Sequence, residues 1–221
     1  MEPVTFTTDD GVRLEGEIRR PDAEPRGLAV VCHPHPRHGG SKDHPLLWAI
    51  RNELAGARGL GVVVFNFRGV MGSTGSYGGG RDEIRDARAA IGWMLAADPA
   101  LPLLRVGWSF GASVALREAL DDRRVTALAL VGLPLRPNDL SLPPLPEPVD
   151  LRHLRPPTLL MAGEHDEYCP PDALRSFASS LPHAEVNVVT GTDHYFWRRE
   201  REAAQIVGAF ADHALAGGDH P

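Results

Sequence analysis

The sequence predicts an α/β fold, in which helices cover both faces of a mostly parallel β-sheet. Short runs rich in Val, Leu and Ile alternate along the chain with longer segments whose apolar residues recur at helical spacing. The short runs are continuously apolar, as is typical of strands buried on both faces. Regular alternation of strand and helix predicts right-handed βαβ units, and therefore parallel neighbours in one sheet.

Composition fits this fold and excludes several classes of protein. The chain has 221 residues, of which 43% are hydrophobic and 24% are charged, so it is long enough to bury a large core. A net charge of -6 argues against a nucleic-acid partner. Two cysteines are too few for a disulfide framework. We expect one domain over residues 1–221, with a flexible tail at 217–221.

The elements follow in order from an opening hairpin. Strands at 4–8 and 13–20 are joined by Asp9-Asp10-Gly11, a hairpin signal that predicts an antiparallel edge. Further strands, each predicted to be buried on both faces, are expected at 28–32, 62–67, 103–108, 125–131, 158–162 and 186–189, which gives eight in all. Helices are expected at 45–57, 82–97, 112–120, 172–180 and 198–214.

A proline-rich segment interrupts this alternation. Residues 134–157 contain eight of the 20 prolines and lack the apolar periodicity of a domain. Two interpretations stay open: a surface crossover between two strands, or a minimal lid beside an active site.

The strongest motif is Gly107-Trp108-Ser109-Phe110-Gly111, between a predicted strand and an alanine-rich helix. A G-x-S-x-G motif in this context predicts a tight turn that projects the serine hydroxyl outward. The glycines allow the chain to crowd at the turn, and the following helix directs its N-terminus at a developing oxyanion. Ser109 is therefore the candidate nucleophile.

Two further stretches carry a family resemblance: His33-Pro34-His35-Pro36, and Phe65-Asn66-Phe67-Arg68-Gly69 with its continuation Gly72-Ser73-Thr74-Gly75. With these motifs the chain resembles the α/β-hydrolase superfamily, in particular small bacterial hydrolases with a His-Pro-His-Pro loop. The resemblance covers roughly residues 14–210 and implies the α/β-hydrolase fold with a minimal lid. The superfamily often has Arg-Gly-x-Gly-x-Ser after the strand that corresponds to the one predicted here at 62–67. Here Met71 occupies the second glycine position.

A serine nucleophile needs a base and an orienting acid. His194 follows the predicted strand at 186–189 and precedes the last helix, which places it at the carboxyl edge of the sheet. Asp166, Glu164 and Glu167 follow the strand at 158–162 at the same edge, and any of them could be the acid. The superfamily pattern Gly-x-x-Asp matches Asp166.

An oxyanion hole needs two backbone N–H groups. We expect one from Phe110, directly after the nucleophile. The other is expected from His35, because its neighbours Pro34 and Pro36 have no N–H.

The three histidines of this loop are also spaced like metal ligands. No nearby carboxylate completes such a site, so we expect no metal and no cofactor. Instead, one of His33, His35 and His38 should cap the loop with a side-chain hydrogen bond, and the others should be partly exposed.

Together these features predict a serine hydrolase that cleaves small ester-like acyl substrates through an acyl-enzyme. Its expected partners are an acyl substrate and water, without nucleic acid or membrane. The expected pocket residues are Leu133, Pro134, Tyr195 and Phe196. A peptidase, a thioesterase, an acyltransferase or a ligand-binding protein on the same fold are the alternatives. Without an export signal or an apolar run of membrane-spanning length, we expect a cytoplasmic protein.

Overall fold

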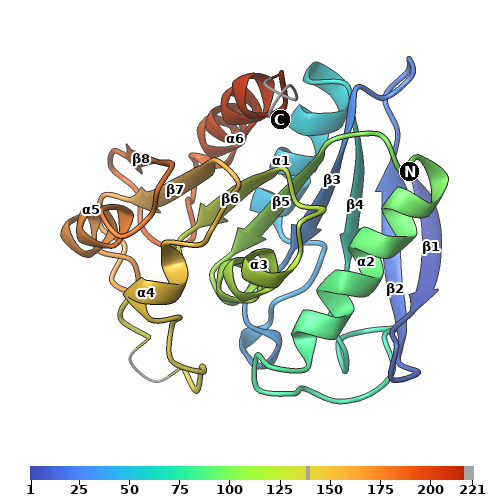
Figure 1. Cartoon of the computed structure of the whole chain (residues 1–221), viewed down its shortest axis with the longest axis horizontal. Helices are drawn as coiled ribbons and strands as arrows, with labels where there is room; N and C mark the ends of the chain where they lie inside the picture. The colour runs from blue at the N-terminus through green and yellow to red at the C-terminus, as the bar shows by residue number, and fades with distance from the viewer. Residues whose placement is uncertain (138–139, 217–221) are drawn as a thin grey trace.

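A computed structural model describes residues 1–137 and 140–216, and places eight strands in one sheet (Figure 1). The strand order is β1-β2-β4-β3-β5-β6-β7-β8. The β1–β2 and β2–β4 pairs are antiparallel and all other pairs are parallel. The strands are β1 (Glu2–Thr7), β2 (Arg13–Arg19), β3 (Gly27–Cys32), β4 (Leu60–Phe65), β5 (Leu103–Trp108), β6 (Ala127–Val131), β7 (Thr158–Gly163) and β8 (Ala184–Val189).

Helices cover both faces of this sheet. The helices α1 and α6 pack together on one face, and α2, α3 and α5 lie on the other, so each face has its own apolar core (Figure 1). The helices are α1 (Pro45–Asn52), α2 (Glu83–Ala97), α3 (Phe110–Asp121), α4 (Pro148–Leu151), α5 (Pro171–Ala178) and α6 (Glu200–Ala216). The predicted architecture, a mostly parallel eight-stranded sheet with an antiparallel N-terminal hairpin and helices on both faces, is confirmed.

The predicted burial is correct for the inner strands and wrong for the last one. Every residue of β3, β4, β5, β6 and β7 is buried, as their continuous apolar runs predict. In contrast, β8 pairs only with β7 and forms an edge of the sheet, which leaves Val186 37% exposed. The apolar run of β8 therefore does not indicate a strand that is buried on both faces.

Two predicted helices differ from the structure in ways that change the helix type or its place beside the candidate nucleophile. The segment predicted as one helix at 45–57 ends its α-helical part at Asn52 and continues as a π-helical turn over Glu53–Ala57. The helix predicted from residue 112 begins at Phe110, directly after the candidate nucleophile. This earlier start brings the N-terminus of α3 to Ser109.

The described part of the proline-rich segment contains one helical turn, α4, and otherwise irregular chain. Hydrogen bonds to the rest of the protein hold it in place. The backbone N–H groups of Leu135 and Arg136 both donate to the carbonyl of Tyr168, each at 2.9 Å. The Arg117 side chain donates to the carbonyls of Pro143 and Pro144, at 2.6 and 2.7 Å.

Two further observations complete the fold. Across residues 1–137 and 140–216, no helix is both long enough and apolar enough to cross a membrane. The expected tail at 217–221 lies outside the described residues.

Candidate active site

Ser109 occupies a strained turn between β5 and α3. Its φ of 55° and ψ of -118° lie outside the regions that L-residues favour, and its N–H donates to the carbonyl of Val131 at 2.8 Å. The flanking glycines are required by close backbone approach. A Cβ on Gly107 would lie 2.2 Å from the carbonyl oxygen of Gly111, and one on Gly111 would lie 2.5 Å from that of Cys32.

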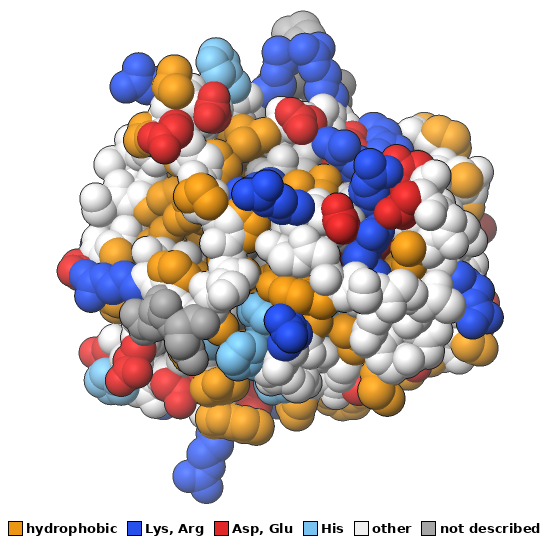
Figure 2. Space-filling view, turned by 90° about the horizontal axis from the view of Figure 1, so that it is seen from below, with side chains coloured by type: hydrophobic (Ala, Val, Ile, Leu, Met, Phe, Trp, Pro, Cys, Tyr) orange, Lys and Arg blue, Asp and Glu red, His pale blue; other side chains and the backbone are white. Residues whose placement is uncertain are grey.

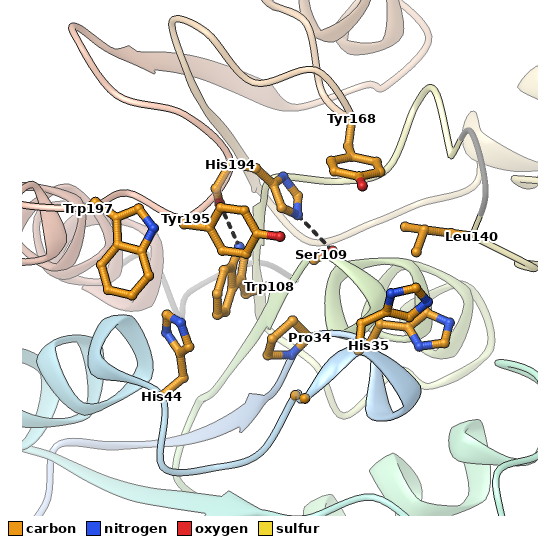
Figure 3. Close-up of a pocket in the computed structure, with 13 residues that line it drawn as sticks. Pro34, His35, His44, Trp108, Ser109, Leu140, Tyr168, His194, Tyr195 and Trp197 are labelled. Atoms are coloured by element: carbon orange, nitrogen blue, oxygen red, sulfur yellow. Dashed lines mark hydrogen bonds between the residues drawn. The ribbon is translucent and has the colours of Figure 1, made fainter.

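The three predicted catalytic residues lie in one hydrogen-bonded series, of which Figure 3 shows the contact between His194 and Ser109. His194 Nε2 is 2.9 Å from Ser109 Oγ, and His194 Nδ1 is 2.8 Å from Asp166 Oδ2. Since a carboxylate accepts hydrogen bonds, Nδ1 carries the proton and Nε2 is free to accept from the serine. All three side chains are buried. Asp166, rather than Glu164 or Glu167, is therefore the carboxylate placed to orient the base.

The Asp166 carboxylate is fixed by its own loop. Its Oδ1 accepts hydrogen bonds from the backbone N–H groups of Tyr168, at 3.0 Å, and Cys169, at 2.8 Å. The Tyr168 ring also packs against the His194 imidazole, with ring centroids 4.9 Å apart. The Cys169 thiol is fully buried, and burial raises its pKa. This loop therefore orients both the acid and the base.

His33 fixes the start of the loop after β3, which contains the predicted oxyanion donor His35. Its Nε2 accepts from the backbone N–H of Phe67 at 3.0 Å, and its Nδ1 donates to the carbonyl of Pro34 at 2.6 Å. Both bonds require the neutral imidazole with its proton on Nδ1. Complete burial lowers the pKa of His33 to about 4, which agrees with this neutral form. The loop after β3 is thereby linked to the end of β4.

His35 caps the same loop. Its Nδ1 accepts from the N–H of Arg37 at 3.2 Å, at the start of the short 3₁₀ turn Pro36–His38. Its Nε2 lies 3.1 Å from the Tyr77 hydroxyl. The His35 ring packs on the Phe110 ring with centroids 5.1 Å apart. The two predicted oxyanion donors, the N–H groups of His35 and Phe110, therefore belong to residues that contact each other beside Ser109.

The loop histidines do not converge on a common point. Both ring nitrogens of His33 have partners, and His35 contacts His38 edge to face. No group of three His, Cys, Asp or Glu side chains within the described ranges is placed to hold a metal ion. The expectation that the histidines other than the capping one are partly exposed is wrong for His33, which is fully buried and packs its ring against that of Phe67.

Met71 takes the conformation that the glycine of the superfamily pattern would supply. Its φ is 49°, and its side chain is 75% exposed, so it contacts little of the protein. The loop is instead held by Arg68, whose backbone N–H and Nε both donate to Asp86 at 2.9 Å. Met71 is not among the described residues that line the cleft beside Ser109.

A cleft of about 160 Å³ opens beside Ser109. Hydrophobic and histidine side chains lie next to one another on the face of the molecule seen in Figure 2. The lining residues, drawn in Figure 3, are Pro34, His35, His38, Gly39, Gly40, His44, Trp108, Ser109, Leu140, Tyr168, His194, Tyr195 and Trp197.

The predicted pocket residues are only partly correct. Tyr195 lines the cleft, whereas Leu133, Pro134 and Phe196 do not. Leu133 and Phe196 are fully buried in the cores on opposite faces of the sheet, and Pro134 is buried as well. Phe196 has a φ of 57°, which turns its side chain inward and leaves its two neighbours at the surface.

Several lining residues were missed by the sequence analysis. Tyr168 and Trp197 lie two and three positions after the predicted acid and base, so their place on those loops is the signal that could have identified them. Trp108 lies within the serine motif itself. His44 sits at the N-cap of α1, and nothing in the local sequence marks it as part of the cleft.

Comparisons with known proteins agree with this fold. A family model described as an alpha/beta hydrolase domain matches residues 29–216. The solved structure of an alpha-beta serine hydrolase homologue from Coxiella burnetii gives a TM-score of 0.82 at 28% identity, over 94% of this chain and 96% of that one. A serine hydrolase without a lid from Xanthomonas campestris gives 0.80 at 28% identity, over 99% and 96%.

Two curated proteins are also similar. An uncharacterized protein of Rickettsia prowazekii is 25% identical over 220 residues, which is 95% of this chain and 88% of that protein. A monoacylglycerol lipase of Mycolicibacterium smegmatis is 30% identical over 117 residues, which is 50% of this chain and 38% of the lipase.

Proposed function

The chain belongs to the α/β-hydrolase family, and we propose that it is a serine hydrolase that cleaves small ester-like acyl substrates with Ser109, His194 and Asp166. The hydrogen-bonded series from Ser109 Oγ through His194 to Asp166, at 2.9 and 2.8 Å, carries this proposal. These distances lie within the range needed for proton transfer from a nucleophile to its base.

The reaction begins when Ser109 Oγ attacks the carbonyl carbon of the ester. His194 Nε2 takes the hydroxyl proton, and the ionised Asp166 stabilises the imidazolium that forms. The oxyanion is stabilised by the N–H groups of His35 and Phe110, aided by the dipole of α3. His194 then returns the proton to the departing alcohol, which leaves an acyl group on Ser109.

Water completes the cycle. His194 Nε2 takes a proton from a water molecule, whose oxygen attacks the acyl carbon. The bond between that carbon and Ser109 Oγ then breaks, the acid product leaves, and His194 returns the proton to Ser109 Oγ. The cleft is open to solvent, so water reaches the acyl group freely, which favours hydrolysis over transfer to another alcohol. Thioesters and amides would react through the same atoms, and a substrate screen separates them from esters.

The dimensions of the cleft favour small substrates. Its volume of about 160 Å³ is below the roughly 300–1,000 Å³ of pockets that enclose drug-sized ligands. From the described part of segment 134–157, only Leu140 lines the cleft. The lidless relative from Xanthomonas campestris supports the same reading.

A fluorophosphonate probe tests the proposal directly, because it reacts only with an activated serine. We expect one equivalent of label on the peptide that contains Ser109, and none after His194→Ala substitution. A folded protein that takes up no label would overturn the proposal and favour a ligand-binding role. Turnover of matched esters, thioesters and amides then identifies the acyl bond that is cleaved.

A further inference from the structure

Four aromatic rings form a continuous wall on one side of the cleft. We call His44, Trp108, Tyr195 and Trp197 the aromatic wall. Successive ring centroids lie 4.3 Å apart for His44–Trp108, 5.8 Å for His44–Trp197 and 6.2 Å for Tyr195–Trp197. Figure 3 shows these rings on one side of Ser109, and His35, Leu140 and Tyr168 on the other. The nucleophile therefore lies at the end of an extended aromatic surface.

The two outer rings are presented to solvent by an unusual backbone. Tyr195 is 45% exposed and Trp197 is 54% exposed, while Phe196 between them is fully buried. Phe196 and Arg198 both have positive φ, of 57° and 65°, which is unfavourable for side chains of this size. Strain of this kind persists where the surrounding structure imposes it, and it concentrates at functional sites.

The loop that carries these rings is well held. The N–H of Tyr195 donates to Asp193 Oδ1 at 2.9 Å, and the N–H of Arg199 donates to the carbonyl of Phe196 at 2.8 Å. The Trp108 indole also donates to the carbonyl of His194 at 3.2 Å. The exposed rings are therefore preorganised, and a ligand that stacks on them need not order the loop first.

The wall offers ring faces and no charge. Among the described residues that line the cleft, none is Lys, Arg, Asp or Glu. Burial lowers the pKa of His44, so its imidazole is neutral at pH 7. The space of about 160 Å³ is close to the roughly 150 Å³ of a cavity known to hold benzene. An uncharged six-membered ring therefore fits both the size and the chemistry of this site.

Building on the proposed function, we propose that the aromatic wall binds an aromatic ring of the substrate, so that the enzyme prefers esters with an aryl group near the scissile bond. Aromatic rings gain from stacked and edge-to-face contacts beyond the area they bury. Saturated rings of the same size bury similar area without that gain. Trp197 and Tyr195 are the specificity-determining residues.

The test compares aromatic with saturated rings. Methyl phenylacetate is paired with methyl cyclohexylacetate, and benzyl acetate with cyclohexylmethyl acetate, so the ring is placed in turn on the acyl and on the alcohol side. We expect kcat/KM to favour the aromatic member of at least one pair by about five- to tenfold. Trp197→Ala and Tyr195→Ala should each reduce that ratio toward one, and Trp197→Phe should retain most of it. Trp48, which is 59% exposed and lies outside the cleft, gives the matched control Trp48→Ala, which should leave the ratio unchanged.

Binding separates this proposal from the hydrolase assignment. In the Ser109→Ala background, benzyl acetate and methyl phenylacetate are titrated by NMR with and without Trp197→Ala. We expect at least one of them to bind about fivefold or more weakly after the tryptophan is removed, even if no ester is turned over. Ratios near one in both pairs for the wild-type protein, or an aromatic preference that survives both alanine substitutions, would overturn the proposal. If the wild-type protein takes up no fluorophosphonate label but still binds the aromatic ring, only the proposed hydrolase activity is rejected.

Discussion

The indole Nε1 of Trp108 donates a hydrogen bond to the backbone carbonyl of His194, 3.2 Å away. The residue directly before the nucleophile thus holds the loop that carries the base. Both groups are buried, and the Trp108 and His194 rings also contact each other, with centroids 6.1 Å apart. This bond gives the second position of the G-x-S-x-G motif a structural role in placing His194 Nε2 next to Ser109.

Trp108→Phe should therefore lower activity without unfolding the protein. The substitution keeps an aromatic ring but leaves the buried His194 carbonyl without this donor, at a cost of about 1 kcal/mol or more. We expect kcat/KM on a short-chain ester to fall about three- to tenfold, chiefly through kcat. Trp48→Phe, at an exposed tryptophan, is the control and should retain full activity. Unchanged kcat/KM in Trp108→Phe would show that this bond does not position the base.

Gly111→Ala should destabilise the turn at the nucleophile. The new Cβ would lie 2.5 Å from the carbonyl oxygen of Cys32 and 2.7 Å from that of His33, so the backbone after β3 would have to move. We expect the free energy of unfolding to fall by about 2–4 kcal/mol and activity to fall with it.

Gly92→Ala provides the matched control in a helix. It lies within α2, and its Cβ would meet only the end of the Arg124 side chain, at 3.7 Å. Alanine should stabilise that helix by about 0.5–1 kcal/mol. Chemical denaturation measures both variants, and equal effects of the two substitutions would contradict the close approach at Gly111.

His33 should make stability depend on pH. Its pKa is about 4 in the folded protein, against an ordinary value of 6.5 for histidine, so between these values the unfolded chain binds more protons. The contribution of this group is complete above pH 6.5 and is lost as the pH falls toward 4, by up to about 3 kcal/mol. We expect the difference in unfolding free energy between wild type and His33→Gln to shrink over this range. A difference that stays constant from pH 7 to pH 4.5 would contradict the assignment of a buried neutral imidazole.

Much of the fold could be predicted from the sequence, because the inner strands carry a strong signal. Continuous apolar runs identify strands such as β5 and β6, which are covered by helices on both faces. The edge strand β8 has a similar run around Val186, yet strand order decides its exposure. Strand order depends on contacts between distant segments, and the local pattern does not contain them.

The candidate site was predictable where a residue type and a chain position define its role. Ser109, Asp166 and His194 each follow the carboxyl end of a parallel strand, at the same edge of the sheet, and the structure brings them into contact. The cleft was less predictable, because side-chain direction in its loops depends on backbone conformation. The positive φ of Phe196 reverses the expected orientation, so Phe196 enters the core and Trp197 lines the cleft.

The most direct measurement is kcat/KM of Ser109→Ala on p-nitrophenyl acetate. This substitution removes the nucleophile and leaves the rest of the site in place. We predict a loss of at least about 1000-fold, with a melting temperature close to that of the wild-type protein. Activity within tenfold of the wild-type value, in a variant that is folded, would contradict the account.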